Sequence, residues 1–130
     1  MHSVKAARVL VVDDCHDSAD GMGEILSTFG YDVDVAYDGN DAIAKARQAA
    51  PDVVLLDLAL PEMDGFQVAQ TLQQEAGSHA PILVAVTGYG REFDKQQSAA
   101  AGFRHHLTKP VDPVQLLETL AKGVGAGPGS

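Results

Sequence analysis

Four charged side chains in this sequence could do chemistry together. Asp13 and Asp14 directly follow one short apolar run, Asp57 directly follows a second, and Lys109 follows a short predicted strand near the C-terminus. A short apolar run bounded by turn residues predicts a strand buried on both faces of a parallel sheet. Because open α/β sheets bind ligands at the carboxyl ends of their strands, we expect these side chains to share one crevice.

The charges in that crevice point to a metal ion and to phosphoryl transfer. Converging carboxylates repel one another, and without a cation at least one would have its pKa raised and hold a proton. Lys109 supplies one positive charge, and an all-oxygen cluster suits Mg²⁺, for which Mn²⁺ could substitute. In a phosphoryl-transfer site, Asp57 would be the nucleophile, and the ion, Lys109 and the Thr87 hydroxyl would stabilise the transferred group.

Five strand–helix units are predicted to position these residues. Hydrophobic periodicity predicts strands at residues 8–12, 32–36, 53–57, 82–86 and 105–108, and helices at 18–29, 39–50, 65–76, 91–101 and 113–121. Parallel strands joined by right-handed helical crossovers form one doubly wound α/β sheet with helices on both faces. The segment 91–101 is polar on all sides, so we expect that helix to pack weakly.

Two predicted helices carry an apolar stripe that we expect to face the core. The first is capped by Asp17 or Ser18 and ends at Gly30, and its inward positions are Met22, Ile25, Leu26 and Phe29. The last opens at Pro113, and its inward positions are Val114, Leu117, Leu120 and Ala121.

Size, charge and cysteine content limit the class of protein. The 130 residues suit one domain, which we place at residues 8–122 between a short leader (1–7) and a flexible Gly-rich tail (123–130). With 18 acidic against 9 basic residues, the net charge of −9 disfavours direct binding to nucleic acid or anionic lipid. Cys15 is the single cysteine, and no apolar run could insert into a membrane, so a cytoplasmic location is expected.

Five separated motifs carry a close family resemblance. They are Val11–Asp14, Leu55–Asp57, Leu60–Gly65, Thr87–Gly88 and Lys109–Pro110. In this order and spacing they resemble the receiver domain of two-component response regulators, and the likeness extends from about Arg8 to Ala121. Agreement among separated motifs is more specific than one glycine pattern.

The resemblance implies a regulatory phosphoacceptor rather than an enzyme. Asp57 would take a phosphoryl group from a histidine kinase or phosphotransfer domain, or from a small donor such as acetyl phosphate. Asp14 would bind Mg²⁺ directly, Asp13 would act mainly through water, and the carbonyl of Ala59 would add a ligand. The fold would be the flavodoxin-like (βα)5 sheet with strand order 2-1-3-4-5, and Lys109–Pro110 would be a cis peptide.

The resemblance also implies a switch and a partner surface. In the family, Thr87 moves toward the phosphoryl group and an aromatic residue swings inward behind it; here that aromatic position holds His106. Partners, or a second copy in a homodimer, would bind the 91–101 helix, the last strand and the last helix. The local sequences at Thr87–Gly90 and His105–His106 resemble those in receivers of hybrid histidine kinases.

Specific residues argue against three other functions. A phosphorylation-independent interaction module would more often lack Asp14, Asp57 or Lys109. A phosphatase of the haloacid dehalogenase type needs an acid where this chain has Ala59. A nucleotide binder of flavodoxin type needs a glycine- or serine-rich phosphate loop, but residues 13–17 are acidic.

Purely structural explanations remain open for single residues. Asp13 and Asp14 could cap the next helix, Thr87 could cap a turn, and Lys109 alone could be a solvated lysine. His105 and His106 are an unlikely zinc pair, because adjacent strand residues point to opposite faces.

Overall fold

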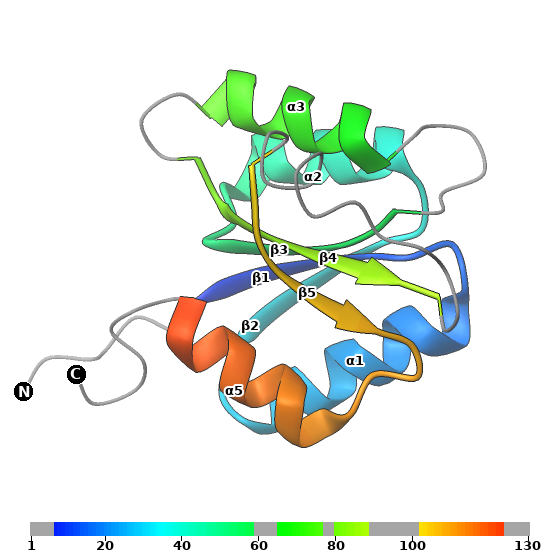
Figure 1. The fold of residues 1–130 in the computed structure, drawn as a ribbon. Coiled ribbons are helices and arrows are strands. Elements are labelled where there is room, and N and C mark those ends of the chain that lie inside the picture. Colours follow the sequence, from blue (N-terminus) through cyan, green and yellow to red (C-terminus); the bar gives the residue numbers. More distant parts are fainter. Residues whose placement is uncertain (1–6, 59–64, 77–79, 89–101, 124–130) are drawn as a thin grey trace, which may run out of the picture.

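A computed structural model describes residues 7–58, 65–76, 80–88 and 102–123 of the chain. Five strands form one parallel sheet: β1 (Arg8–Val12), β2 (Asp32–Ala36), β3 (Val53–Asp57), β4 (Ile82–Thr87) and β5 (Phe103–Thr108). The order is β2-β1-β3-β4-β5, which confirms the predicted topology and places β3 at the centre (Figure 1).

Two layers of helices enclose this sheet. In the described residues they are α1 (His16–Thr28), α2 (Gly39–Ala49), α3 (Gly65–Ala76) and α5 (Pro113–Gly123). Helices α2 and α3 cover one face, and α1 and α5 cover the other (Figure 1). The helix predicted over residues 91–101 lies outside the described residues. No helix in the described ranges is long and apolar enough to cross a bilayer.

Alternation along the strands builds two hydrophobic cores. In β3, Val54 and Leu56 face the α2/α3 layer, whereas Val53 and Leu55 face the α1/α5 layer. All five residues of β3 are buried, as expected for a central parallel strand with both faces covered. The sheet therefore holds the end of β3, where Asp57 lies, in a rigid position.

The first helix differs from its prediction in where it begins and in the burial of Phe29. It begins at His16 after Cys15, with no side-chain cap, so the cap expected from Asp17 or Ser18 was wrong. The chain turns earlier because Asp13 Oδ1 accepts the N–H of Cys15 at 3.0 Å. Phe29 is 62% exposed rather than in the core. Gly30 ends the helix with a φ of 93°, as predicted.

The buried stripe of the last helix is also rotated from its prediction. Leu116 and Leu120, one turn apart, are fully buried against the α1/α5 face of the sheet. Val114 is 61% exposed and Ala121 is exposed, so these two residues were wrongly assigned to the core. Leu117 lies at the margin of the stripe, partly buried. Placing Leu116 inward turns Val114, two residues earlier, toward solvent.

The domain boundaries stay predictions. The leader and the Gly-rich tail lie almost wholly outside the described residues, which begin at residue 7 and end at residue 123. Between those points the strands and helices share the two cores of a single sheet, as one domain should.

Candidate acidic site at the carboxyl edge of the sheet

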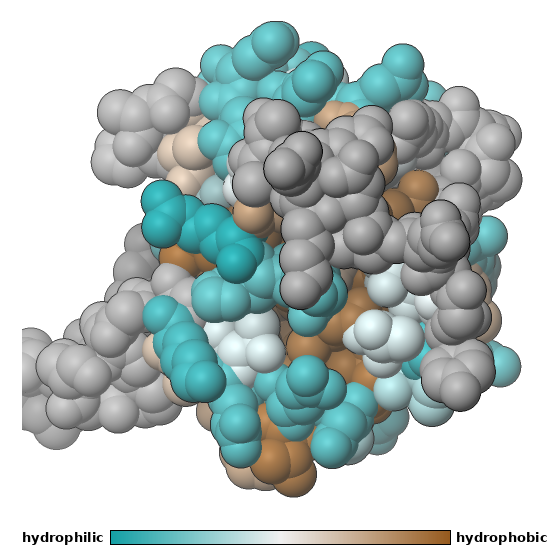
Figure 2. Space-filling view, viewed as in Figure 1, coloured by the Kyte–Doolittle hydropathy of each residue, from teal (hydrophilic) through white to brown (hydrophobic). Residues whose placement is uncertain are grey.

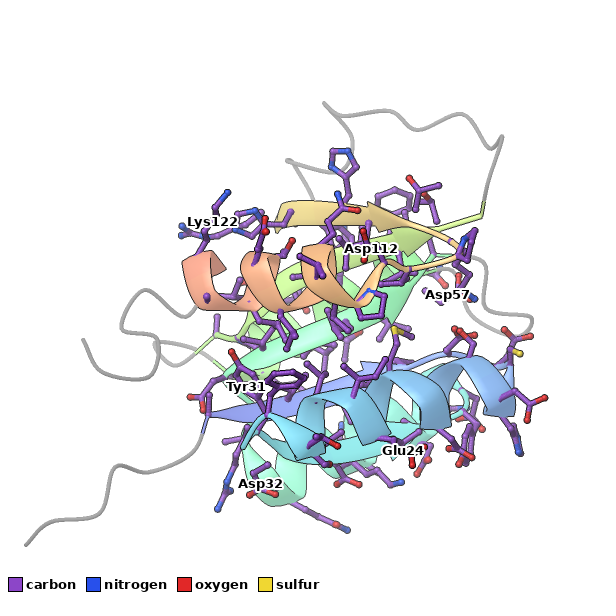
Figure 3. All side chains as sticks on the ribbon, turned by 90° about the horizontal axis from the view of Figure 1, so that it is seen from below. Glu24, Tyr31, Asp32, Asp57, Asp112 and Lys122 are labelled. Atoms are coloured by element: carbon purple, nitrogen blue, oxygen red, sulfur yellow. The ribbon has the colours of Figure 1, made fainter. Side chains whose placement is uncertain are left out.

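The sheet brings the predicted site residues to one edge. Asp13 follows β1, Asp57 ends β3, Thr87 ends β4 and Lys109 follows β5. Figure 3 shows Asp57 at the end of the sheet opposite Tyr31 and Asp32, which lie near the start of β2. Because all the strands are parallel, every strand end of this kind lies along the same edge.

Strand alternation selects which of these side chains meet. Asp57 continues the side of Leu55, and Leu55 faces the α1/α5 layer. Asp13 and Lys109 continue the sides of Val11 and Leu107, which face the same layer. Three side chains from three strands are thereby directed to the same face at the same edge.

Lys109 joins the two buried carboxylates. Its Nζ lies 3.0 Å from Asp57 Oδ2 and 2.7 Å from Asp13 Oδ2. Its backbone N–H donates to the carbonyl of Thr87 at 2.7 Å, which ties the end of β4 to the residue after β5. The Lys109–Pro110 peptide bond is cis, as the resemblance implied. The lysine is therefore held by main-chain and side-chain contacts together.

Asp14 completes a cluster of three carboxylates. One oxygen each from Asp13, Asp14 and Asp57 lies within 4.8 Å of the others. Asp13 is 0% exposed and Asp57 is 4% exposed, whereas Asp14 is exposed. Two acids are thus buried with one lysine between them, and the third opens the cluster to solvent.

Attraction between opposite charges shifts the pKa of Asp13 and the pKa of Lys109 in opposite directions. Burial by itself would raise the pKa of Asp13, but Lys109 and the N–H of Cys15 outweigh it, and the pKa is lowered from its ordinary 3.8. Burial likewise would lower the pKa of Lys109, but Asp13 and Asp57 outweigh it, and the pKa is raised from 10.5. Near neutral pH the Asp13 carboxylate and the Lys109 ammonium are therefore both ionised.

The donor set fits a hard divalent cation. Lys109 offers one positive charge against three carboxylates. Asp13 Oδ2 is buried and, in the part of the chain that is described, has an ion-pair partner in Lys109 but no donor with hydrogen-bond geometry. Oxygen ligands, a buried carboxylate oxygen that has capacity for a further partner and an opening to water are the features that Mg²⁺ uses, because it keeps several of its own waters.

The structure places two of the three remaining predicted site residues. Thr87 is 5% exposed at the end of β4. His106 is exposed on β5 and lies opposite Ala85 in the sheet register, with His105 directed to the other face. Ala59 lies outside the described residues.

An apolar groove beside the lysine was not predicted. It has a volume of about 520 Å³ between α1 and the segment after β5. It is lined by the apolar side chains of Met22, Ile25, Pro110 and Val111 and by Gly21. Lys109, which contacts the acidic cluster, also lines it. Figure 2 shows apolar surface (brown) in the region of α1 and α5, bordered by hydrophilic side chains. Met22 and Ile25 had been assigned to the core alone, because periodicity does not distinguish a core stripe from the floor of a groove.

Comparisons with known proteins agree with this arrangement. A family model described as the response regulator receiver domain matches residues 9–121. PilH of Pseudomonas aeruginosa is 40% identical over 114 residues, which are 88% of this chain and 94% of PilH. The response regulator PleD of Caulobacter vibrioides is 38% identical over 111 residues, which are 85% of this chain and 24% of PleD.

The solved structures show the same fold. The chemotaxis protein CheY4 of Vibrio cholerae is similar with a TM-score of 0.84 at 31% identity, covering 91% of this chain and 98% of that chain. The strand order, the acidic edge and the match across residues 9–121 lead to one conclusion. The chain belongs to the response regulator receiver domain family, the regulatory domains that partner with histidine kinases or phosphotransfer proteins in two-component signalling.

Proposed function

We propose that this receiver domain is a Mg²⁺-dependent switch that accepts a phosphoryl group on Asp57. The observation that carries the proposal is the Lys109 bridge, 3.0 Å from Asp57 and 2.7 Å from Asp13, in a buried acidic cluster. Asp57 supplies the nucleophile. Lys109, together with a cation held by the carboxylates, supplies the positive charge that a transferred phosphoryl group needs.

Each site residue has a role in the transfer. A carboxylate oxygen of Asp57 attacks the phosphorus of a phosphohistidine or an acyl phosphate, the bond to the donor breaks, and the donor leaves with the electron pair of that bond. Lys109 and the Thr87 hydroxyl bind phosphoryl oxygens as Asp57 gives up its own negative charge. Asp13, Asp14, Asp57 and the carbonyl of Ala59 would hold Mg²⁺, which supplies neutralising charge when bound.

The switch would be transmitted through the ends of β4 and β5. Thr87 and Lys109 are joined there through the backbone at 2.7 Å, so a shift of Thr87 toward the phosphoryl group would act on β5. His106 stands on β5 at the position where the family resemblance implies an aromatic switch residue. We propose β5 and α5, with the 91–101 segment, as the output surface, in a cytoplasmic protein or in the receiver of a hybrid kinase.

Incubation with acetyl phosphate tests this function directly. Wild-type protein with Mg²⁺ is expected to gain a phosphoryl-sized mass, and the same sample with a chelator is expected to gain none, because the clustered carboxylates repel the donor without a cation. Intact-mass spectrometry provides the measurement. A folded protein that binds Mg²⁺ yet gains no mass, with acetyl phosphate or with any kinase, would support the phosphorylation-independent module instead.

We further propose that a protein donor docks one of its helices in the groove beside Lys109. A donor must bring its phosphohistidine to Asp57, and the groove starts at the lysine that contacts Asp57 and continues along α1. Its walls are largely apolar, which suits the apolar stripe of an amphipathic helix.

A side chain that fills the groove should slow phosphoryl transfer from a protein donor but not from a small donor. A Cβ added at Gly21 meets nothing within 4 Å, so Gly21→Trp is expected to fold and to occupy the groove. Transfer from a phosphorylated kinase should fall by about tenfold or more, since a loss of 1.4 kcal/mol in binding is tenfold. Labelling by acetyl phosphate should not change.

Gly21→Ala is the matched control, because it also removes a glycine from the helix but leaves the groove open. Equal transfer rates for the tryptophan and alanine variants would place the donor elsewhere. A parallel loss of acetyl phosphate labelling would show damage to the site rather than to docking.

A further inference from the structure

One edge of the sheet ends in a strand that has a neighbouring strand on one side only among the described residues. β2 pairs only with β1 in the described residues, at the end of the order β2-β1-β3-β4-β5 (Figure 1). The N–H of Asp32 and the carbonyl of Ala36 bond to the β1 side, to Ala7 and Asp13 respectively. Because backbone groups alternate along a strand, those of Val33 and Val35 face outward.

Side chains occupy both outward groups of Val35. Its N–H donates to Asp34 Oδ1 at 3.1 Å, and its carbonyl accepts from the Nζ of Lys45 on α2. A neighbouring strand would need these same two groups for its own hydrogen bonds. The edge is therefore closed at Val35 by a side-chain donor and a side-chain acceptor.

Further charges hold Lys45 in this position. Its Nζ lies 3.7 Å from Asp34 Oδ1 and 3.4 Å from Asp41 Oδ2, one turn earlier on α2. The side chains of Asp34 and Asp41 are 54% and 38% exposed, and ion pairs with such exposed partners add little to folding stability. Stability alone is thus a weak explanation for three acceptors directed at one lysine.

We propose that Asp34 and Lys45 close the free edge of β2 against strand addition by a second copy of this chain. A second copy fits this edge because two β2 strands related by a two-fold axis can pair antiparallel, each offering the same outward groups. Such pairing would also bring Asp34 of both copies together, so the aspartate blocks the edge by charge as well as by its hydrogen bond.

Removing both side chains should expose the edge. The variant Asp34→Ala with Lys45→Ala leaves the net charge unchanged and is expected to dimerise at least about tenfold more tightly than wild type in sedimentation velocity. Arg47→Ala with Glu75→Ala is the matched control, since it also removes one exposed ion pair and leaves the net charge unchanged, away from the β2 edge and from α5.

A proline separates edge pairing from any other association. Adding Val35→Pro to the edge variant removes the outward N–H without removing a bond to β1, so the triple variant should return to the wild-type dissociation constant. If the edge variant associates no more tightly than the Arg47→Ala, Glu75→Ala control, or if proline leaves its association intact, the proposal is wrong.

Hydrogen exchange tests the same closure in the unmodified protein. The Val35 amide, bonded to Asp34, should exchange several-fold more slowly than the Val33 amide, which faces the same edge. Asp34→Ala should remove that difference. Equal exchange at Val33 and Val35 in wild type would overturn the proposal even if an edge variant failed to fold.

Discussion

Replacing Asp57 with asparagine is expected to abolish the phosphoryl gain while leaving the protein at least as stable without Mg²⁺ as the wild type. The amide keeps the shape of the side chain but is not a nucleophile that can form an acyl phosphate. Asp57 is 4% exposed, so the substitution also removes a buried negative charge. Intact-mass spectrometry and urea denaturation, on the same preparation, measure the two effects.

The stability gain follows from the local charge balance. Asp13 and Asp57 share Lys109 as their cation, with Asp14 within 4.8 Å, so one fewer carboxylate lessens the repulsion. The same loss should weaken cation binding. Ligand linkage stabilises a protein by about 2.7 kcal/mol at a concentration one hundred times the dissociation constant. At matched Mg²⁺, Asp57→Asn should therefore gain less stability than wild type.

Asp112→Asn provides the control for this variant. Asp112 is exposed at the start of α5, where its Oδ1 accepts the N–H of Val114 at 3.0 Å, and asparagine caps helices about as well as aspartate. Its phosphoryl gain and its response to Mg²⁺ should match wild type. If Asp57→Asn still gained a phosphoryl group at the wild-type rate, Asp57 would not be the acceptor.

The strands and the site were predictable from sequence because both depend on local patterns. The apolar run of β3 ends in Asp57, and its bounds are those predicted. Alternation with a period of two explains why Asp13 joins Asp57 and Lys109, while the adjacent Asp14 lies exposed. The strand order, in contrast, came from the family resemblance, because several orders satisfy the same succession of elements.

The helix faces were harder because packing partners decide them. Val114 and Leu116 are both apolar, and only the rotation of α5 about its own axis, fixed by its packing on the sheet, exposes the first and buries the second. Phe29 likewise fits the apolar period of α1 but extends past the last turn that the sheet covers. Periodicity shows that a helix has an apolar stripe, but not where the neighbouring layer ends.

Features built from distant segments left no signal in the sequence. The groove unites α1 with the segment after β5, more than eighty residues later in the chain. The contact of Lys45 with Val35 crosses from a helix to a strand edge, and a lysine at this position of α2 could have made an ordinary surface pair instead. Such contacts depend on the relative placement of elements, which no short window of sequence describes.

Replacing Lys109 with methionine is expected to impair both stability and phosphorylation. Removing one partner of a fully buried ion pair costs about 3–5 kcal/mol. Because 26% of the Lys109 side chain is exposed, we expect a smaller loss in unfolding free energy, about 2–3 kcal/mol near neutral pH. The phosphorylation rate with acetyl phosphate should fall about 10²–10³-fold, the usual loss for one group that stabilises developing negative charge.

The stability loss should depend on pH in a defined direction. The lowered pKa of Asp13 gives wild type a stabilisation that is present above 3.8 and is lost as pH falls through the folded-state value. The raised pKa of Lys109 gives a stabilisation that is present below 10.5 and is lost as pH rises through its folded-state value. The gap between wild type and Lys109→Met should be widest between these limits and narrow in acid, where the carboxyls bind protons.

Urea denaturation across this pH range measures the gap, with Lys122→Met on the exposed end of α5 as the control for loss of a lysine. Mg²⁺ should restore more stability to Lys109→Met than it adds to wild type, because the cation then replaces the only ammonium near Asp13 and Asp57 among the described residues. A gap that stayed constant into acid, or that Mg²⁺ did not reduce, would mean that Lys109 acts through packing rather than through its charge.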